Sequence, residues 1–482
     1  MNIKLVLNTL GKVILIEVIF LFFPFLVSAI YGETCIVAFV ETIGVALTLG
    51  LSLVFFCKSK EKNTFVKDGT AIVVLSWIIM SVIGALPFVF SGEIPNFFDA
   101  FFETVSGFTT TGSSICTNVE KLSHGILFWR SLTHWVGGMG VLVFFLAISS
   151  KGQQRTINIL KAEMPGPSVD KLMPKAGTTA RILYIIYFVL TLIEVVLLWV
   201  GDMNLFEALV HTFGTAGTGG FGIKCDGLAG YSAYSQWVIT IFMLLFGVNF
   251  NFYFLILLGN IKTVLKSNEL WVYLGIYAAS AAIIAYNVTS MFNTAGEAIR
   301  HSCFQVSSIL TTTGFATCDF NQWPQISRTI LVLIMFFGGC AGSTAGGIKM
   351  SRVVVIFQSM RNNIRRNVRP RSVNKIKLNC KVVDENMERS IINYLALYVV
   401  IHVIAVLLIS FEPFDFETNF TAVVSCINNI GPGLGVVGPA GNFSGYTAFS
   451  KIVLSFSMLM GRLEIMPLVM FLCPDFWSKR SR

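Results

Sequence analysis

Apolar residues in this chain are gathered into long runs that are separated by short polar segments. A helix needs about 20 predominantly apolar residues to cross the hydrocarbon core of a bilayer. Runs of adequate length lie near residues 11–30, 36–57, 70–91, 125–149, 180–200, 235–258, 270–290, 326–348, 391–411 and 447–472. The pattern therefore predicts an all-α integral membrane protein with ten transmembrane helices.

The first run has a second interpretation, as a secretory signal peptide. Lys4 and Lys12 lie at its start, and Val27-Ser28-Ala29 has the small residues of a cleavage site. Glu17 interrupts the run, however, and a second span follows at once. We therefore favour a membrane-spanning helix.

The composition supports a membrane protein and narrows its function. Of the 482 residues, 54% are hydrophobic and only 13% are charged, which is about half the charged fraction of soluble domains. The net charge of +9 does not indicate nucleic-acid binding, because the 43 Phe lie in uncharged runs. The ten Cys show no CxxC pair and no zinc spacing. Since no nucleophile–base pair or phosphate-binding motif is found either, we do not expect an enzyme.

The distribution of Lys and Arg predicts the orientation. With both termini in the cytoplasm, only six of the 35 Lys and Arg fall in outer segments, and one, Arg462, lies within a span. Cytoplasmic loops carry the excess of positive charge, so we expect the N-terminus and the C-terminus to be cytoplasmic. The basic cytoplasmic stretches are 58–67, 151–181 and 361–381. They favour contact with anionic membrane lipids, and a docking surface for a cytosolic partner can coexist with that contact.

Four outer connections share one pattern, a short helical stretch followed by a polar segment that contains glycine. They are residues 96–113, 205–221, 298–315 and 419–432, and their glycines recur 108, 94 and 117 residues apart. The pattern predicts a fourfold internal repeat of span, half-helix, glycine loop and span. Because each unit has an even number of full spans, all four loops enter from the outer side. The repeat is parallel, and the four re-entrant pore loops can meet at one point.

Loops of this composition suit a bare alkali cation. A cation that loses its water needs oxygen ligands, which backbone carbonyls can supply. Glycine lets the chain turn successive carbonyls toward one axis, and each half-helix directs the negative end of its dipole at the centre. Two of the loops also match G-x-G-x-x-G, but neither follows a strand, so no organic cofactor is expected.

Several strings of residues carry a resemblance to a known family. They are Trp135–Gly140, Ala162–Ser168, Gly338–Lys349, Asn429–Gly435 and Gly461–Glu464. Over essentially its whole length the chain resembles the Trk/Ktr/HKT superfamily of potassium transporters, and within it the TrkH/TrkG type. The resemblance implies a channel-like pore for K⁺, or for K⁺ with Na⁺, in a multi-pass protein of the bacterial inner membrane. It also implies a homodimer and a cytosolic ring of nucleotide-binding TrkA-type subunits that gates the pore.

By the same resemblance the chain divides into an N-terminal unit and four pore repeats. The two-helix N-terminal unit covers residues 1–66, and the repeats cover 67–150, 151–265, 266–381 and 382–482. The residues that would form the K⁺-binding selectivity filter are Thr110, Thr111, Gly112, Thr218, Gly219, Gly220, Thr312, Thr313, Gly314, Asn429, Ile430 and Gly431. The four loops differ from one another, and each is shorter than the five-residue filter of symmetric potassium channels.

Two features below the predicted filter are candidates for a gate. The eighth run contains Gly342, Ser343, Thr344, Gly346, Gly347 and Lys349 within residues 338–349. Glycine costs a helix about 1 kcal/mol relative to alanine, so we expect a break there, with a kink or a close crossing of small residues as the alternative. The family resemblance favours a gating loop. Arg462 lies deep in the tenth span, where we expect it to repel cations and steady this loop, with a buried salt bridge as the alternative.

Acidic residues give two further expectations. The outer segments hold 13 Asp and Glu. We expect them to form a vestibule that concentrates cations, with ordinary solvated loop faces explaining part of the excess. They include Glu103, Asp202, Glu207, Glu297, Asp319, Glu412 and Asp415. Glu17, Glu41 and Glu194 lie within spans, where an interfacial position or an interhelical hydrogen bond is favoured over an ion or proton relay.

The sequence thus favours uptake of K⁺ down its electrochemical gradient. A proton- or sodium-coupled potassium symporter on the same fold is the main alternative. A carrier with alternating access is disfavoured, because such folds usually place one site between two repeats that are often inverted. A membrane scaffold without transport would leave the four glycine loops without a role.

Overall fold

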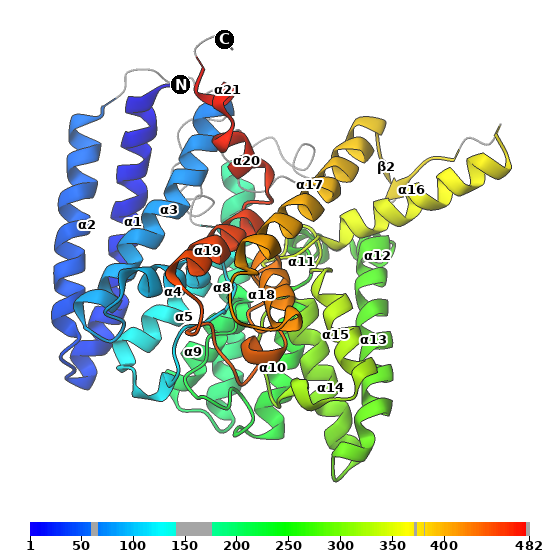
Figure 1. Ribbon diagram of the computed structural model, residues 1–482, viewed down its shortest axis with the longest axis horizontal. Coiled ribbons are helices and arrows are strands. Elements are labelled where there is room, and N and C mark those ends of the chain that lie inside the picture. The colour runs from blue at the N-terminus through cyan, green and yellow to red at the C-terminus, as the bar shows by residue number, and fades with distance from the viewer. Residues whose placement is uncertain (59–65, 141–175, 371–373, 380, 479–482) are drawn as a thin grey trace.

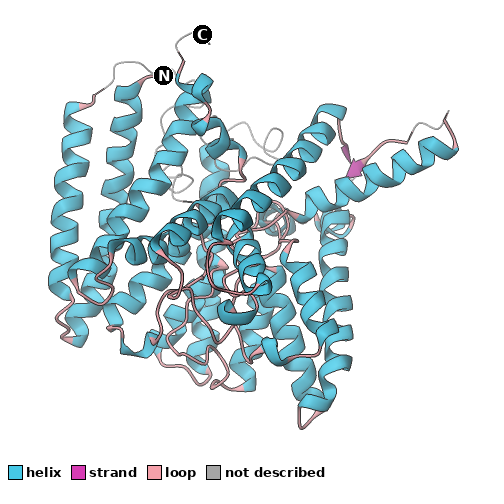
Figure 2. Ribbon diagram, viewed as in Figure 1, coloured by secondary structure: helices cyan, strands magenta, loops and turns pink. Residues whose placement is uncertain are grey.

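The computed structural model describes residues 1–58, 66–140, 176–370, 374–379 and 381–478, and within them the fold is almost entirely helical (Figure 1, Figure 2). The string Ala162–Ser168 and most of the basic stretch 151–181 lie outside these residues. The helices are α1 (Ile3–Tyr31), α2 (Ile36–Phe56), α3 (Val66–Phe90), α4 (Phe97–Phe108), α5 (His124–Gly138), α8 (Ala176–Val200), α9 (Leu205–Gly217), α10 (Ala233–Phe246), α11 (Phe250–Leu257), α12 (Ile261–Leu265), α13 (Asn268–Val288), α14 (Ala295–Leu310), α15 (Gln325–Met335), α16 (Met350–Val368), α17 (Glu385–Ile409), α18 (Phe416–Asn428), α19 (Ala448–Arg462), α20 (Met466–Leu472) and α21 (Pro474–Trp477). An antiparallel pair of two-residue strands, β1 (Lys377–Leu378) and β2 (Lys381–Val382), joins α16 to α17.

Among the described residues, six helices are long and apolar enough to cross a membrane, and each coincides with a predicted span. They are α1, α2, α3, α8, α13 and α17. The first apolar run belongs to the 29-residue helix α1, which packs against α2, α3 and α5. Helices α1, α2 and α3 stand side by side at one edge of the molecule, and the N-terminal end of α1 lies at the same end of the molecule as α21 (Figure 1).

The other four predicted spans are shorter than expected or broken. The run 235–258 forms α10 and α11, which meet at 88°. The chain turns there because α10 ends at Gly247 and the side chain of Asn249 caps α11, accepting a hydrogen bond from the N–H of Asn251 at 2.9 Å. The run 447–472 forms α19 and α20, which are separated by Glu464 and Ile465 in backbone conformations with positive φ.

The remaining two of these spans also end early. Helix α5 has 15 residues and ends at Gly138, and α15 has only 11 residues before a non-helical segment begins. Hydropathy therefore located both segments but overestimated the helix of the run 326–348. The last part of the run 125–149, residues 141–149, lies outside the described residues. In each predicted repeat the first helix is continuous, and the second ends or bends within the bundle.

Four short helices, α4, α9, α14 and α18, lie between the helices of these pairs and match the predicted half-helices. Each begins at a polar N-cap whose side chain accepts a backbone N–H, a favourable way to satisfy the free donors of a first turn. The caps are Asn96, Asn204, Thr294 and Asp415. Each short helix packs against the long helix before it, and its C-terminal half is buried. All four therefore carry the chain from the surface to the interior.

Candidate functional site

The four short helices end in the same unusual backbone conformation. The residues that follow them, Thr110, Thr218, Thr312 and Asn429, have φ of 57°, 56°, 59° and 56°. Two residues further on, Gly112, Gly220, Gly314 and Gly431 have φ of 84°, 82°, 81° and 105°. Positive φ is rare for a β-branched residue such as Thr. Its recurrence at four separate places shows that the surrounding fold imposes one loop geometry four times.

The four loops close into a ring, which we call the loop ring (residues 110–112, 218–220, 312–314 and 429–431). A Cβ atom added to Gly112 would collide with the carbonyl oxygen of Gly219 in the second loop. In the same way Gly220 abuts the carbonyl of Thr313, and Gly314 abuts the carbonyl of Ile430. The fourth loop meets the first, since a Cβ atom on Gly431 would lie 2.8 Å from the carbonyl oxygen of Thr111.

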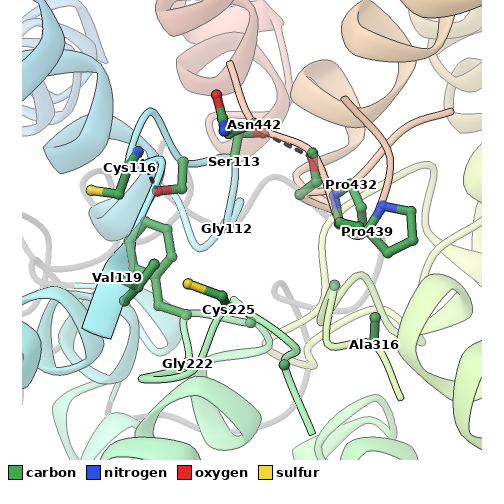
Figure 3. A pocket seen from close by; sticks show the side chains of 18 of the residues that line it. Gly112, Ser113, Cys116, Val119, Gly222, Cys225, Ala316, Pro432, Pro439 and Asn442 are labelled. Atoms are coloured by element: carbon green, nitrogen blue, oxygen red, sulfur yellow. Dashed lines mark hydrogen bonds between the residues drawn. The ribbon is translucent and has the colours of Figure 1, made fainter. Parts of the chain in front are cut away.

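A cavity of about 160 Å³, lined by all four ring glycines, opens on one side of the ring. We call this side outer and the opposite side inner, in keeping with the orientation that the sequence predicts. Figure 3 shows Gly112, Gly222, Ala316 and Pro432 around one opening, each from a different segment of the chain. Backbone carbonyls beside such an opening can replace the water of a monovalent cation. No cluster of His, Cys, Asp or Glu that could hold a metal ion occurs in the part of the chain that the structure describes.

A buried ion pair holds the outer side of the ring. Glu103 of α4 and Arg130 of α5 are 1% and 2% exposed, and Arg130 Nη2 lies 2.6 Å from Glu103 Oε1. Glu103 also accepts the N–H of Ile115 at 2.9 Å, just beyond the first loop. The guanidinium of Arg130 lies 4.1 Å from the ring centre of Phe221, just beyond the second loop. The pair therefore ties two neighbouring loops to α5.

The predicted acidic vestibule is not found in the lining of this cavity. The cavity lining includes Arg130 and Lys224 and contains no Asp or Glu. The outer carboxylates cap helices instead: Glu207 completes a capping box on α9, Asp415 caps α18, and Glu412 accepts the N–H of Thr447 at 3.0 Å at the start of α19. Helix N-termini favour such negative charge, so the acidic excess has a local structural cause.

Hydrogen bonding at these caps also changes the acidity of the carboxyl groups. Burial raises the pKa of the Asp202 carboxyl, but hydrogen bonds from Ser235 and Ser232 outweigh it and hold the pKa below its usual range. At Glu412 burial is likewise outweighed, here by hydrogen bonds from Ser450 and Thr447, and its pKa is lowered. Both carboxyl groups are therefore charged at neutral pH, and each accepts hydrogen bonds at the N-terminus of a helix on the outer side.

A non-helical segment between α15 and α16, which we call the glycine-rich loop (residues 336–349), lies against the inner side of the ring. The N–H of Gly346 donates to Thr312 Oγ1 at 2.7 Å, and a Cβ atom on Gly346 would collide with the carbonyl of Asn428. Thr344 Oγ1 donates to the carbonyl of Phe246 at 3.2 Å. The predicted break is confirmed, and a kinked continuous helix is wrong because α15 ends at Met335.

The other predicted residues of this loop have clear structural roles. Gly342 and Gly347 have φ of 75° and 67°, values that favour glycine. Ser343 Oγ donates to the carbonyl of Cys340 at 2.7 Å, and the Lys349 ammonium donates to the carbonyl of Ala345. These contacts fold the loop onto itself.

Arg462, the last residue of α19, connects the ring to the glycine-rich loop. Its Nη1 donates to the carbonyl of Thr344 at 2.9 Å and to Thr110 Oγ1 at 3.3 Å. Its Nη2 donates to the carbonyls of Gly137 and Gly138 at the end of α5. Glu464, which lies beyond the end of α19, pairs with Arg352 instead. The guanidinium is therefore fixed largely by carbonyl oxygens at the inner side of the ring.

Three residues that contact the ring or the glycine-rich loop were not predicted from the sequence. His134 Nδ1 lies 2.8 Å from the carbonyl of Gly107, and its ring occupies the place that a Cβ atom on Gly219 would take. Glu269 accepts the N–H of Ala341 at 2.6 Å. Arg352 donates its backbone N–H to the carbonyl of Lys349 at 2.9 Å and pairs with Glu464 through its side chain. One feature of the sequence could have indicated all three: each is a charged or imidazole side chain inside or beside a predicted span.

Of the three carboxyl groups of the spans, one is exposed and two are buried. Glu41 is exposed, whereas Glu17 and Glu194 are 1% and 0% exposed. Neither oxygen of Glu17 has a hydrogen-bond partner among the described residues. The expectation of an interfacial or hydrogen-bonded Glu17 is therefore wrong.

Comparison with known proteins gives the family. A family model described as TrkH, cation transport protein, matches residues 36–258 and 251–479. The chain is 35% identical to the Trk system potassium uptake protein TrkH of Escherichia coli (strain K12), over 99% of this chain and 100% of that protein. It is 32% identical to the Trk system potassium uptake protein TrkG of the same strain, over 94% of each chain.

A solved structure agrees over the whole length. The crystal structure of the potassium transporter TrkH from Vibrio parahaemolyticus matches with a TM-score of 0.90 and 30% identity, covering 99% of this chain and 100% of that one. These relatives are transport proteins, which confirms the expectation of a transporter and not an enzyme. The chain belongs to the TrkH family of cation transport proteins.

Proposed function

We propose that this chain takes up K⁺ across the bacterial inner membrane through the centre of the loop ring. The observation that carries the proposal is the closure of the ring, in which four loops of equal backbone geometry each abut the next. A closed ring brings backbone oxygens from all four segments to one place, as a desolvated cation requires. The relatives named as Trk system potassium uptake proteins support K⁺ as the cargo.

Within this proposal the ring is a selectivity filter. The carbonyls of Thr111, Gly219, Thr313 and Ile430 are the best candidates for ligands, because each precedes a ring glycine and lies at a junction between loops. The remaining filter residues, Thr110, Gly112, Thr218, Gly220, Thr312, Gly314, Asn429 and Gly431, set the backbone turn. The inner ends of α4, α9, α14 and α18 add partial negative charge.

The glycine-rich loop and Arg462 form the proposed gate. The loop lies against the inner side of the ring through Thr312 and Asn428, and the Arg462 guanidinium holds it through Thr344. A fixed positive charge at that position resists the passage of a cation. Movement of Gly342–Lys349 away from the ring would open the path.

The proposed assembly follows the names of the relatives, which describe components of a Trk system. We propose a homodimer that is regulated by a cytosolic nucleotide-binding ring of the TrkA type. Both termini are proposed to be cytoplasmic, in keeping with the positive-inside bias. An N-terminal unit (1–66) precedes the pore repeats 67–150, 151–265, 266–381 and 382–482.

A specific observation also supports coupled symport as a second candidate. Glu17 is buried in α1, and a Cβ atom on Gly84 of α3 would lie 3.2 Å from its Oε1. Ionisable groups inside a span often mark proton pathways. A proton-coupled mechanism predicts that Glu17→Gln removes any dependence of transport on a pH gradient.

Flux through purified protein in liposomes tests both candidates. K⁺, Rb⁺ and Na⁺ are compared side by side, with and without a pH gradient. We expect a current that reverses at the K⁺ equilibrium potential and does not move with the pH gradient. A reversal potential that follows the pH gradient would instead establish symport, and no flux of any of the three ions would refute transport through the ring.

A further inference from the structure

Helix α16 has an apolar stripe along its second half that the other described residues leave exposed. Its first half is buried, but the second half projects from the helical body (Figure 1). Phe357, Met360, Ile364 and Val368 recur at helical spacing and are 62%, 55%, 63% and 74% exposed. A helix that combines such a stripe with a basic flank is typical of the membrane interface.

A basic pocket of about 600 Å³ lies on the flank of this stripe. Its lining is Asn268, Gln358, Arg361, Asn362, Arg365, Asn374, Lys375 and Lys377. Four of these eight side chains are cationic and none is acidic. None of the ion pairs found in the described part of the chain involves Arg361, Arg365, Lys375 or Lys377.

The pocket is held together by hydrogen bonds between its two walls. Gln358 of α16 binds the backbone of Lys377 twice, through Nε2 to the carbonyl and through Oε1 to the N–H, both at 2.9 Å. One turn further on, Asn362 Nδ2 donates to the carbonyl of Asn374 at 3.5 Å. Because these contacts fix the second wall against α16, the four cations are gathered before any ligand arrives.

The position of the pocket identifies the kind of anion. Asn268 is the first residue of α13, a helix long and apolar enough to span a membrane. The pocket therefore lies where a span reaches the surface of the bilayer, beside an apolar stripe. Arginine and lysine side chains bind phosphate oxygens through charge-assisted hydrogen bonds.

We propose that the basic pocket binds the phosphate of an anionic phospholipid, whose acyl chains lie along Phe357, Met360 and Ile364. The lipid belongs to the cytoplasmic leaflet in the orientation proposed above, so the leaflet assignment rests on the proposed function. Charge complementarity and the adjacent apolar stripe both favour a lipid over a soluble anion, which has no use for the stripe.

The pocket is linked to the glycine-rich loop through Glu269, the neighbour of Asn268. The Glu269 carboxylate accepts the N–H of Ala341 in that loop at 2.6 Å and a hydrogen bond from Asn379 Nδ2 at 3.4 Å. Asn379 directly follows β1, which contains the pocket residue Lys377. A lipid that steadies β1 therefore steadies the acceptor of the glycine-rich loop, and transport becomes sensitive to the lipid.

Lipid retention by the full-length protein tests the site without requiring transport. The protein is reconstituted with phosphatidylglycerol and phosphatidylcholine, and the lipid that stays bound on gentle extraction is counted by native mass spectrometry. We expect preferential retention of phosphatidylglycerol, and at least a tenfold weaker preference in the variant Arg361→Gln/Lys375→Gln. The matched control Arg366→Gln/Arg369→Gln removes the same charge from exposed positions outside the pocket and is expected to retain lipid like the unmodified protein.

Three outcomes would overturn the proposal. Equal retention by the pocket variant and the unmodified protein would place the lipid elsewhere. Equal loss in the control variant would show that only total charge matters. Displacement of the lipid by inorganic phosphate at equal concentration would identify a soluble anion as the ligand.

A parallel measurement of Rb⁺ flux separates this proposal from the proposed function. In vesicles with phosphatidylglycerol the unmodified protein is expected to show a different flux from that in phosphatidylcholine alone, and the pocket variant is expected to lose the difference. Absent flux with normal retention would refute the transport proposal and leave the lipid site supported. Flux that is independent of the lipid in the unmodified protein would refute the link through Glu269.

Discussion

The loop ring and the glycine-rich loop lie next to each other, but they differ in how often the loop occurs and in the contacts that hold it. One loop geometry occurs four times in the ring, with φ of 56–59° at each Thr or Asn and positive φ at each Gly. The four loops abut one another mainly through backbone atoms, with one side-chain hydrogen bond from Asn429 to Thr111 at 2.9 Å. The glycine-rich loop occurs once, and separate hydrogen bonds hold it. Side chains make three of them: Thr312 binds Gly346, Arg462 binds Thr344, and Glu269 binds Ala341. Backbone groups make two more, from Cys340 to the carbonyl of Gly247 and from Phe250 to the carbonyl of Gly342.

This difference separates a fixed element from a movable one. Backbone contacts between four loops cannot be lost one at a time without opening the ring, so its geometry resists change. Single hydrogen bonds contribute only about 0.5–1.5 kcal/mol each, or about 1.5–3 kcal/mol when one group is charged. A loop held by separate hydrogen bonds of this size can give them up one after another, which is what a regulated gate requires.

The largest effect is expected when the ring itself is broken. Gly220→Ala places a Cβ atom against the Thr313 carbonyl in a backbone with φ of 82°, which an alanine adopts at a cost of about 1–2 kcal/mol. We expect Rb⁺ flux in liposomes to fall at least about 100-fold, as when a reacting group is displaced by about 1 Å. Gly222→Ala is the matched control, because its Cβ atom would meet nothing closer than 3.7 Å. Equal flux in the two variants would contradict a filter at the ring.

The second largest effect is expected when part of the glycine-rich loop is deleted and the loop ring is left intact. Deletion of residues 342–346 takes away the segment that contacts Thr312 and Asn428. We expect a pore that leaks Rb⁺ without its regulator, measured in liposomes with protein that elutes and melts like the parent. A deletion variant that folds and stays closed would show that the gate lies elsewhere.

The sequence predicts the loop ring and the glycine-rich loop through different features, a repeated pattern for the first and a local density of glycine for the second. Gly112, Gly220, Gly314 and Gly431 were found because the same pattern recurs four times. The order in which the loops meet could not be predicted, since contacts such as Gly220 with Thr313 join segments far apart in the chain. The break in the eighth run was found because glycine density is a local signal.

Other features were missed because they depend on partners that hydropathy does not record. The 88° bend between α10 and α11 depends on the cap at Asn249, and a window average across 235–258 hides it. Glu103 was assigned to an acidic vestibule because its partner, Arg130, is 27 residues away on another helix. A charge inside an apolar stretch was therefore a sound signal, but its role was set by the tertiary fold.

The third largest effect is expected when the positive charge of Arg462, which connects the loop ring to the glycine-rich loop, is removed. Arg462→Ala removes the guanidinium that binds Thr344 and Thr110. At an effective dielectric constant of about 20, a unit charge about 10 Å from a cation costs roughly 1.7 kcal/mol, or roughly tenfold in rate. We expect Rb⁺ flux to rise by about that factor.

The conservative variant separates charge from shape at this position. Arg462→Lys keeps the positive charge but loses the planar fork that bridges several carbonyls. We expect its flux to stay near that of the parent, with a weaker dependence on the regulator. A flux that is unchanged or lower in well-folded Arg462→Ala would refute the electrostatic restriction.

The smallest effect is expected at a site that supports α5 but touches neither the ring nor the glycine-rich loop. Glu33, between α1 and α2, accepts the N–H groups of His124 and Gly125 at 2.7 and 3.0 Å, at the start of α5. Burial raises the pKa of the Glu33 carboxyl, but hydrogen bonds from Gly125 and His124 outweigh it and lower the pKa.

The sign of the pH dependence at Glu33 follows from this lowered pKa. The charged form stabilises the folded state above the ordinary value for Glu, about 4.3, and the contribution is lost as the pH falls through the lower folded value. Glu33→Gln should therefore reduce thermal stability at pH 7, by no more than about 1 kcal/mol at this partly solvated site. The difference from the parent should shrink in thermal melts recorded below about pH 4, while Rb⁺ flux at pH 7 stays unchanged. A change in flux would instead show that the N-terminal helices act on the ring through α5, whose last carbonyls, at Gly137 and Gly138, bind Arg462.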